Sequence, residues 1–509
     1  MDGHRQPAYK HTFSDMWKCP TALGYWNIDL VTRYADALPC DVNLETYITR
    51  RVKSKLPMMS AAMDDIGGSP MMIGLALDGV VGTADKTGTP AGQAAVVKRT
   101  KRFQQGCIND PMVLGPNSPV DEAVSIWNVH RYKAIPVTED AQVHGKLVGM
   151  LREDAYVLGQ HSGEKVSEWM KQPSELEIRP YGITPAEAAN IILETGRSEL
   201  LVVDNNHSLW GMYKLADIRM SHEYQNASKD SKGRLLVAAA VGGPGSDLTE
   251  RLKHLAEAEV DILVIDTSQG CSKGVGELTL PIIKRDYPDI DVIAGNVDNG
   301  KSARYLMERG ADAVKVGIGP SPICRTKRNI GGGEQQAAAV SESKQEAIRY
   351  KEECGVDVPI IADGGITEIA GDFIKAYACG ASAVMIGSLL AGVDEAPGEK
   401  VQLPGHEGFF KRYRGMGSID AQNAGSSSRY CQDGKTPKKP VSHGVVAYMP
   451  CKGPVQDQIL KISNTLKDAM SKYYNCRTIA DLNKGDLEFT IVNRNPPEEP
   501  HNLVIMKGE

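Results

Sequence analysis

The 509-residue chain has no long apolar run, no cysteine pair with metal-ligand spacing and no excess of basic charge. None of its apolar stretches approaches the roughly 18 residues that a membrane-spanning helix needs. The first residues, MDGHRQPAYKHTF, lack the apolar core of a signal peptide. A net charge of -6 argues against a nucleic-acid-binding protein, which would carry a broad basic surface. We therefore expect no membrane partner, no nucleic-acid partner and a cytoplasmic location.

Ten cysteines are scattered along the chain without a Cys-x-x-Cys pair. This distribution indicates neither a structural zinc site nor a disulfide framework, so reduced thiols are expected. A hydrophobic content of 41% and a charged content of 24% are typical of a globular protein. Because 509 residues exceed one ordinary domain, we expect at least two.

An internal repeat predicts a smaller domain inserted in a larger one. The stretch SPVDEAVSIWNVHRYKAIPVTED, from Ser118, is echoed by TPAEAANIILETGRSELLVVDNN, from Thr184. Each copy predicts an amphipathic helix, a strand, a polar turn and a second strand, with Gly149 and Gly211 at equivalent points. The repeat predicts an inserted domain over 107–224 and a discontinuous catalytic domain over 1–106 and 225–509. Chance similarity of two such segments is the alternative.

Outside the insert, short apolar segments alternate with helical ones, as is typical of a parallel α/β fold. Eight segments predict strands: 56–63, 79–84, 235–241, 261–266, 291–297, 313–319, 359–365 and 383–389. Eight parallel strands with intervening helices predict a closed (β/α)8 barrel of the TIM type, with the insert between the second and third strands. A doubly wound open sheet is the structural alternative.

In such a barrel the C-terminal ends of the strands form the working face. The small or polar residues at these ends are Ser60, Asp266, Asn296, Gly317, Asp363 and Ser388. Gly364, Gly365 and Gly387 also lie where a strand is followed by a helix, so an anion can approach backbone N–H groups there. Their position on the last two strands predicts a phosphate site.

The longest loop between the predicted strands, GIGPSPICRTKRNIGGGEQQ, follows the sixth strand and contains Cys324. We expect Lys315, Arg325, Lys327 and Arg328 to surround this thiol and to favour its thiolate, the nucleophilic form. Long loops on the catalytic face of a barrel often carry functional residues. Cys324 is therefore the candidate nucleophile, with an ordinary free loop cysteine as the alternative.

The order of these segments resembles the IMP dehydrogenase/GMP reductase family. The matching segments are SAAM (60–63), DTSQG (266–270), AGNV (294–297), VGIGPSPICRT (316–326), ADGGI (362–366), MIGS (385–388) and YRGMGS (413–418). They extend along nearly the whole chain. The insert resembles the family's pair of cystathionine-β-synthase (CBS) domains, which form a regulatory nucleotide-binding module.

The resemblance implies the NAD-dependent oxidation of IMP to xanthosine monophosphate in guanine nucleotide synthesis. Cys324 would attack C2 of the hypoxanthine ring, a hydride would pass from C2 to NAD, and the adduct would be hydrolysed. The other implied catalytic residues are Thr326, Arg429 and Tyr430, the last two on a flap over about 419–450. The implied substrate-binding residues are Ser60, Asp363, Gly365, Gly387, Ser388, Tyr413, Met416, Gly417 and His443. The implied cofactor-binding residues are Asp266, Asn296 and Gly317.

Several positions depart from the family pattern. Ser321 and Pro322 replace a glycine and a serine, and proline donates no hydrogen bond, so one phosphate contact must be lost or rerouted. Arg325 replaces a threonine, and His443 replaces the Gln or Glu that contacts the base edge. The carbonyls of Gly319, Ser321 and Cys324 could ligate a potassium ion, but the family's C-terminal Glu-Gly-Gly is present only as NPPEEPHN.

The insert departs from the family as well. Arg152, Ala155 and Lys214 replace residues that hold the ribose of a regulatory nucleotide, whereas Asp217 is retained. Binding of a regulatory purine nucleotide and a purely structural insert therefore both stay open. The resemblance also implies a homotetramer, which the CBS modules can pair into an octamer.

Two other functions stay open. GMP reductase shares the barrel, the cysteine and the phosphate loops, but it deaminates GMP with NADPH and lacks a long flap. Here SSSRYCQDGKTPKKPVSHGV resembles the dehydrogenase flap. The second alternative is a nucleotide-binding sensor that has lost catalysis. Pro322 and Arg325 motivate it. The retained residues that argue against it are Cys324, Thr326, Arg429 and Tyr430.

Overall fold

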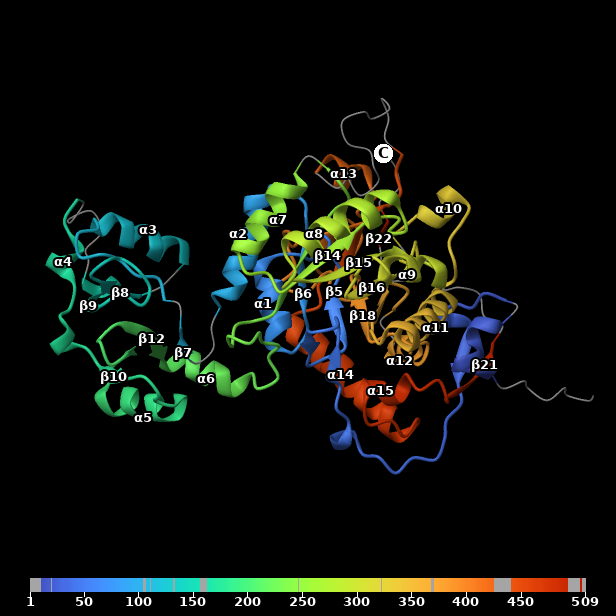
Figure 1. Ribbon diagram of the computed structural model, residues 1–509, viewed down its shortest axis with the longest axis horizontal. Helices are drawn as coiled ribbons and strands as arrows, with labels where there is room; N and C mark the ends of the chain where they lie inside the picture. The colour runs from blue at the N-terminus through green and yellow to red at the C-terminus, as the bar shows by residue number, and fades with distance from the viewer. Residues whose placement is uncertain are drawn as a thin grey trace, which may run out of the picture. The chain divides into compact units, whose positions relative to one another are not determined.

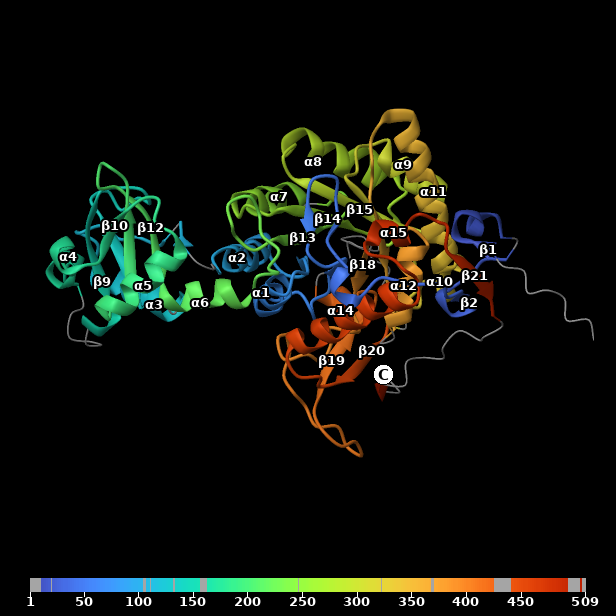
Figure 2. The same cartoon turned by 90° about the horizontal axis from the view of Figure 1, so that it is seen from below.

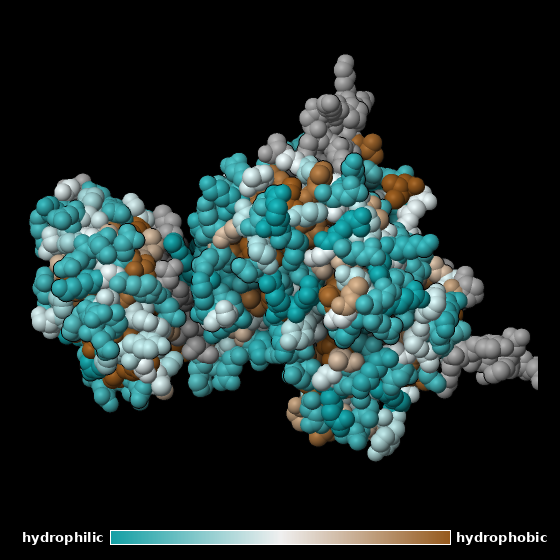
Figure 3. Space-filling view, in the orientation of Figure 1, coloured by the Kyte–Doolittle hydropathy of each residue, from teal (hydrophilic) through white to brown (hydrophobic). Residues whose placement is uncertain are grey.

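The computed structural model describes residues 11–19, 21–103, 107–109, 111–130, 133–155, 163–245, 247–321, 323–367, 370–424, 441–492 and 504–505. The chain forms two compact units (Figure 1), one of Met1–Lys101 and Asn226–Glu509 and the other of Arg102–Gln225. Within the described ranges, no helix is long and apolar enough to cross a membrane. The visible face of each unit in Figure 3 is mostly hydrophilic, with small apolar patches.

Eight parallel strands form the centre of the larger unit. They are β5 (Met58–Ser60), β6 (Gly82–Ala84), β13 (Val237–Val241), β14 (Ile262–Asp266), β15 (Asp291–Val297), β16 (Ala313–Val316), β17 (Ile360–Asp363) and β18 (Ala383–Ile386). From β6 to β18 each strand pairs with the next along the chain, and β18 pairs with β5. A parallel bridge between Met59 and Val81 joins β5 to the residues before β6 and closes the ring. The predicted (β/α)8 barrel is confirmed, and the open sheet is wrong.

Helices surround these strands (Figures 1 and 2). They are α1 (Ser69–Leu77), α2 (Pro90–Lys101), α7 (Leu248–Glu257), α8 (Leu280–Asp286), α9 (Gly300–Met307), α11 (Gln336–Cys354) and α12 (Ala370–Ala378). In α7 the buried Leu248, Leu252 and Leu255 recur at helical spacing and form the face that packs on the barrel. The hydrophobic period of the sequence thus determines which side of each helix is inside.

The remaining elements of this unit lie around the barrel. They are β1 (His11–Thr12), β2 (Ile28–Leu30), β3 (Thr46–Tyr47), β4 (Lys53–Ser54), α10 (Thr326–Ile330), β19 (Phe410–Arg414), α13 (Ile419–Asn423), β20 (Val446–Pro450), α14 (Val455–Lys472), α15 (Ile479–Leu482), β21 (Glu488–Ile491) and β22 (Val504–Ile505). Strands β19, β20 and β22 form one small sheet, and β1, β21 and β2 form another. The first of these sheets carries Tyr413, one of the candidate site residues.

Side chains alternate between the inside and the outside of the barrel. The apolar cluster that the strands enclose includes Ile262, Val264, Ala313 and Ile361. By the same alternation, the next inward positions on β14, β16 and β17 are Asp266, Lys315 and Asp363. The barrel interior is therefore apolar along most of these strands and charged at their C-terminal ends.

The smaller unit contains two copies of a helix followed by an antiparallel hairpin. The first copy is α3 (Val120–His130), β8 (Ala134–Thr138) and β9 (Leu147–Arg152), and the second is α5 (Pro185–Thr195), β11 (Glu199–Val203) and β12 (Leu209–Lys214). The unit also contains β7 (Cys107–Ile108), α4 (Val166–Trp169), β10 (Ile178–Pro180) and α6 (Leu215–Glu223). Gly149 pairs with Val137 and Gly211 with Val202, and each pair is followed by a register shift. The two copies therefore share their order of elements and their strand register.

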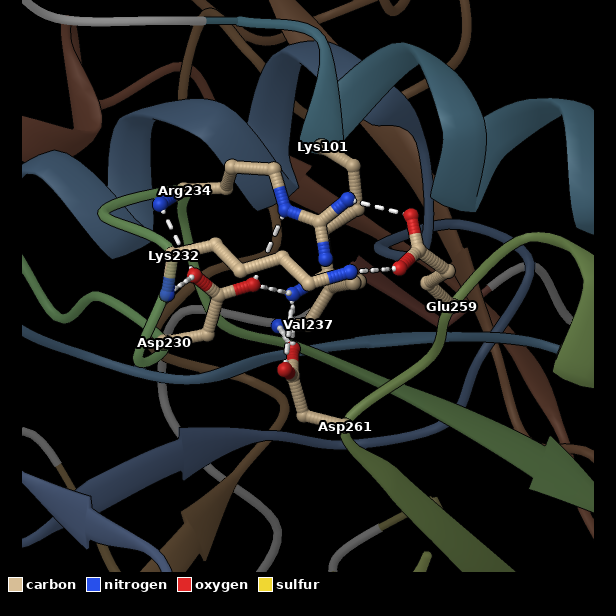
Figure 4. A network of polar contacts seen from close by, with 7 residues as sticks. All are labelled: Lys101, Asp230, Lys232, Arg234, Val237, Glu259 and Asp261. Atoms are coloured by element: carbon tan, nitrogen blue, oxygen red, sulfur yellow. Dashed lines mark hydrogen bonds and ion pairs between the residues drawn. The ribbon is translucent and has the colours of Figure 1, made fainter. Parts of the chain in front are cut away.

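A cluster of ion pairs lies at the N-terminal ends of β13 and β14 (Figure 4). Lys101, the last residue of α2, is 3% exposed and donates to Asp230 at 2.9 Å and to Asp261 at 2.7 Å. Asp261 also accepts the N–H of Val237 at 2.8 Å, and Arg234 donates to Asp230 at 3.0 Å. Lys101 precedes the smaller unit in the chain and Asp230 follows it, so the cluster joins the two points where the chain leaves and re-enters the barrel unit.

The charges of this cluster favour the ionised forms of Asp230 and Glu259. Burial raises the pKa of Asp261, even though Lys101 acts in the opposite direction. Burial opposes ionisation of Asp230, but hydrogen bonds and charges from Lys101 and Arg234 outweigh it and hold its pKa below the ordinary value. Hydrogen bonds and charges from Arg234 and Lys232 lower the pKa of Glu259 to about 2. Lys101 is thus the buried cation that compensates two buried carboxylates.

Replacing Lys101 by methionine should destabilise the barrel unit, because Asp230 and Asp261 would stay buried without their cation. Loss of one partner of a buried ion pair typically costs about 3–5 kcal/mol. Urea unfolding should show this loss. Lys253→Met is the matched control, since the Lys253 side chain is 72% exposed, and it should change stability by less than about 0.5 kcal/mol. Equal unfolding midpoints for the two variants would show that the cluster contributes nothing.

Candidate active site

Four side chains converge inside the C-terminal end of the barrel. The ammonium of Lys315, which is fully buried, donates to Asp266 at 2.7 Å, to Asp363 at 2.8 Å and also to the side-chain oxygen of Asn296. The Asn296 amide donates to Asp363 at 2.7 Å and to the Gly317 carbonyl at 2.6 Å. Three strands, β14, β15 and β17, are therefore connected through one lysine on β16.

The position of Lys315 differs from the one that we expect from the sequence. The loop composition suggests a cation beside the Cys324 thiol, but Lys315 is inside the barrel and is neutralised by two carboxylates. The physical reason is the alternation along β16, where the inward Ala313 makes Lys315 inward as well. Applying this alternation to the sequence would have found the residue.

Gly317 allows the end of β16 to approach the end of β17 closely. Its φ is +146°, and a Cβ at this position would lie 2.2 Å from the Asp363 carbonyl oxygen. The buried Gln336 supports the same contact, because its amide donates to the Val316 carbonyl at 2.9 Å and to the Asp363 carbonyl at 3.3 Å. Sequence analysis missed Gln336, which stands at the start of a helix and has no motif of its own.

The candidate nucleophile lies on the loop after β16. The Cys324 side chain is partly exposed, and its sulfur donates to the Thr326 hydroxyl at 3.1 Å. Its backbone N–H donates to the Ser321 carbonyl at 3.0 Å. Thr326 is buried at the first turn of α10. The structure therefore brings these two predicted catalytic residues together.

Backbone hydrogen bonds hold the cysteine loop against the chain that precedes β20. Arg325 N–H donates to the His443 carbonyl at 2.8 Å, and Val445 N–H donates to the Ile323 carbonyl at 3.1 Å. His443 N–H donates to the Gly417 carbonyl at 2.7 Å. The predicted residues Gly417 and His443 are thus beside the cysteine loop.

The Gln422 side chain was missed by sequence analysis. It donates to the carbonyls of Gly417 at 3.0 Å and Val441 at 2.9 Å. Gln422 therefore holds Gly417 close to Val441. These two residues precede and follow the predicted Arg–Tyr segment. Arg429, Tyr430 and Pro322 lie outside the described residues.

The predicted phosphate site brings Gly387 close to Tyr413. The Tyr413 hydroxyl, buried on β19, lies 2.9 Å from the place that a Cβ of Gly387 would take. Burial raises the pKa of Tyr413, Asp65 acts in the same direction, and a hydrogen bond with Ser321 acts in the opposite one. The tyrosine is therefore a neutral hydrogen-bonding group between the turn after β18 and the cysteine loop. Gly365, with φ of +77°, forms the turn after β17.

Other predicted residues are arranged differently. The hydroxyl of Ser60 is fully buried and accepts the N–H of Thr83 at 2.8 Å, which joins β5 to β6. Arg325 and Arg328 are exposed. Burial lowers the pKa of Lys327, whereas Asp298, Glu334 and Cys324 act in the opposite direction. Lys327 is therefore the cation of this loop that interacts with the thiol.

An acidic pair beside β19 was also missed. Arg414 donates through its side chain to Asp64 at 3.0 Å and through its backbone N–H to Asp65 at 2.7 Å. Burial, reinforced by the charge of Asp64, raises the pKa of Asp65 to about 6. These contacts attach the segment that carries Tyr413 and Met416, itself buried, to the loop after β5.

A closed parallel barrel with a cysteine loop and glycine turns on one face is the architecture of a barrel enzyme. The model of the IMP dehydrogenase/GMP reductase domain matches residues 22–502 of this chain. The chain is 38% identical to inosine-5'-monophosphate dehydrogenase of Aquifex aeolicus over 91% of its own length and 92% of that protein. It is also 38% identical to inosine-5'-monophosphate dehydrogenase of Bacillus subtilis over 88% and 89% of the two chains.

Among solved structures, it resembles a GMP reductase variant of Trypanosoma brucei in complex with guanosine 5'-monophosphate. The TM-score is 0.79 at 29% identity, over 93% of this chain and 96% of that one. The same enzyme in complex with guanosine 5'-triphosphate gives a TM-score of 0.73 at 26% identity, over 94% and 99%. The chain belongs to the IMP dehydrogenase/GMP reductase family.

Gly317→Ala should destabilise the barrel unit. A side chain at this φ costs about 1–3 kcal/mol, and its Cβ would also collide with the Asp363 carbonyl. Gly332→Ala is the control in the same loop, because the nearest atoms to its added Cβ are 3.9 Å away. Urea unfolding of both variants should show the loss for Gly317→Ala alone. An unchanged midpoint for Gly317→Ala would mean that the loop adjusts without strain.

Proposed function

We propose that this chain is an IMP dehydrogenase, which oxidises IMP to xanthosine monophosphate with NAD through a covalent adduct on Cys324. The observation that carries this proposal is the pairing of the Cys324 thiol with Thr326 at 3.1 Å, on a loop held against His443 and Val445. The IMP dehydrogenases of A. aeolicus and B. subtilis, at 38% identity over most of both chains, support the same activity.

Nucleotide binding would use the groups around the cysteine loop. Asp363 would accept hydrogen bonds from the ribose hydroxyls, and the phosphate would lie against Gly365, Gly387, Ser388 and the neutral Tyr413. Glycine turns at strand ends give an anion access to backbone N–H groups. The base would then extend toward the cysteine loop, which supports C2 as the atom that Cys324 attacks.

The base edge would meet Met416, Gly417 and His443. Burial lowers the pKa of His443, so its ring is neutral at neutral pH. A neutral imidazole has one donor and one acceptor nitrogen, and either can pair with a purine edge. His443 would therefore take the place of the amide or carboxyl group that the family has at this position.

The cofactor would be bound by Asp266, Asn296 and Gly317. Asp266 is 3% exposed and Asn296 is 4% exposed at the ends of neighbouring strands, and a carboxylate and an amide are suitable partners for the hydroxyls and carboxamide of a nicotinamide riboside. NAD, when bound, supplies the acceptor for the hydride that leaves C2.

The reaction then requires water. In the first step the Cys324–C2 bond forms and the hydride leaves C2. In the second step water adds to C2 and the Cys324–C2 bond breaks. The net change consumes IMP, NAD and water and gives xanthosine monophosphate, NADH and a proton. Thr326 is positioned beside the sulfur to help orient this water, and Arg429 with Tyr430 would remove its proton.

GMP reductase is the second candidate, and a specific observation favours it. The T. brucei GMP reductase aligns with 93% of this chain at a TM-score of 0.79. A GMP reductase can therefore match this chain over nearly its whole length, so chain length does not distinguish a GMP reductase from an IMP dehydrogenase. The curated relatives at 38% identity favour the dehydrogenase. A catalytically inactive sensor is a third outcome of the test.

We also propose that Arg102–Gln225 is a CBS pair that binds a regulatory purine nucleotide. Arg152 is engaged by Asp154 at 3.1 Å and by Glu199 of the second repeat. Asp217, whose pKa is raised by burial, is retained in the second repeat, which makes that repeat the better candidate. A GMP reductase of this fold has been solved in complex with guanosine 5'-triphosphate. Potassium activation, a tetramer or octamer and a cytoplasmic location stay predictions.

The purified protein should produce NADH from IMP and NAD and should not oxidise NADPH with GMP. Cys324→Ala should abolish NADH production and still bind IMP, because the thiol acts only in the covalent step. Cys451→Ala, which removes another partly exposed thiol, is the control and should keep full activity. NADPH oxidation with GMP and no NADH from IMP would identify a GMP reductase. IMP binding with neither reaction would identify a sensor.

Arg429→Ala should separate hydride transfer from hydrolysis. Hydride transfer needs no activated water, so a burst of one NADH per active site should remain. Steady turnover should fall by about 10²–10⁴, the usual cost of a lost proton acceptor. Lys438→Ala, in the same segment, should leave both phases unchanged. Rapid-quench mass spectrometry should detect the adduct on Cys324. If the burst disappears as well, Arg429 acts in binding or hydride transfer.

A further inference from the structure

We propose that Lys315 is a positioning residue that couples the substrate ribose site to the cofactor site. This proposal rests on the proposed function, because it concerns the same Asp363, Asp266 and Asn296 side chains. Lys315 itself would touch neither nucleotide. It would act by keeping both carboxylates charged and aimed toward the C-terminal face of the barrel.

The first argument is geometric. The Lys315 ammonium lies 2.7 Å from an Asp266 oxygen and 2.8 Å from an Asp363 oxygen, and it also donates to Asn296. An ammonium group has three protons, and these three partners match them. Because the three partners come from β14, β15 and β17, the position of each is linked to that of the others.

The second argument is electrostatic. The buried Asp266 and the partly buried Asp363 share one site, and two neighbouring carboxylates are not both easily ionised without a cation. Asp363 would hold the ribose as a charged acceptor, so its ionised form matters for binding. Tyr413 and Cys324 also interact electrostatically across this region, and Tyr413 is neutral because burial raises its pKa. Lys315 is the buried cation that bonds directly to the two carboxylates.

The chain contains a matched control for these arguments. Lys101 is also a buried lysine between two aspartates, Asp230 and Asp261. Asp261 directly precedes β14 and Asp266 ends it, so the two lysines serve opposite ends of one strand. A merely structural effect of removing a buried lysine would be shared by both positions.

The test measures IMP binding by calorimetry over a range of pH for Lys315→Met, Lys315→Arg and Lys101→Met. All carry Cys324→Ala, so that titration of the thiol does not contribute. In Lys315→Met one carboxylate should take up a proton as the pH falls, because two neighbouring carboxylates would repel each other without the cation between them. IMP binding should therefore weaken about 10- to 100-fold at mildly acidic pH, the range for a lost charge-assisted hydrogen bond, and recover at alkaline pH.

Lys315→Arg should restore the pH dependence of IMP binding that the Cys324→Ala parent shows, and Lys101→Met should bind IMP as that parent does. In the background with Cys324 intact, Lys315→Met should also raise the KM for NAD. Circular dichroism and gel filtration establish that each variant is folded. If Lys315→Met and Lys101→Met bind IMP alike at every pH, the proposal is overturned. Failure of the proposed function would be seen separately, as absence of NADH production by the unmodified protein.

Discussion

The compensation of buried carboxylates by buried lysines is the constraint on which this barrel depends. Strand β14 has Asp261 before its first residue and Asp266 as its last, and a buried lysine binds each of them. At the N-terminal end the cation is Lys101, and at the C-terminal end it is Lys315. Because an unpaired charge in the interior is very unfavourable, neither end of the strand can move without its partners. The C-terminal pair lies inside the barrel above the apolar cluster, whereas the N-terminal pair lies between α2 and the outer side of the strand.

The pairing of carboxylates with lysines also explains why the N-terminal and C-terminal ends of the barrel have different roles. The N-terminal cluster joins α2 to the chain that re-enters the barrel, so it serves the connection to the smaller unit. The C-terminal cluster places an aspartate from each of β14 and β17 beside the cysteine loop. Gly317 and Gln336 then bring the ends of β16 and β17 together. Strand β14 thus contacts the ion-pair cluster near the chain connection at its N-terminal end, and it belongs to the candidate active site at its C-terminal end.

Most of the fold could be predicted from the sequence, because strand and helix periods are local properties of the chain. The eight strand segments follow from such patterns, whereas the pairing of Cys324 with Thr326 was implied only by the resemblance to the family. The site was predicted less completely, since partners such as Gln422 and Val441 are set by tertiary contacts that leave no local pattern. Ser60 was predicted as a site residue because it is a polar residue at a strand end, but its hydroxyl instead accepts a hydrogen bond from the neighbouring strand. Lys315 was predicted to lie near the Cys324 thiol because of its charge. The inward direction of its side chain follows instead from the alternation of side chains along β16.

The ion pair of Lys101 with Asp230, at 2.9 Å, has a consequence for the chain connection. Lys101 and Asp230, both in the barrel unit, precede and follow the smaller unit in the chain, so a chain without that unit would need only a short connection between α2 and the residues before β13. The barrel core would keep every strand and every strand-end charge through such a deletion. The smaller unit is therefore an insertion whose removal would leave the strand pairing of the barrel intact.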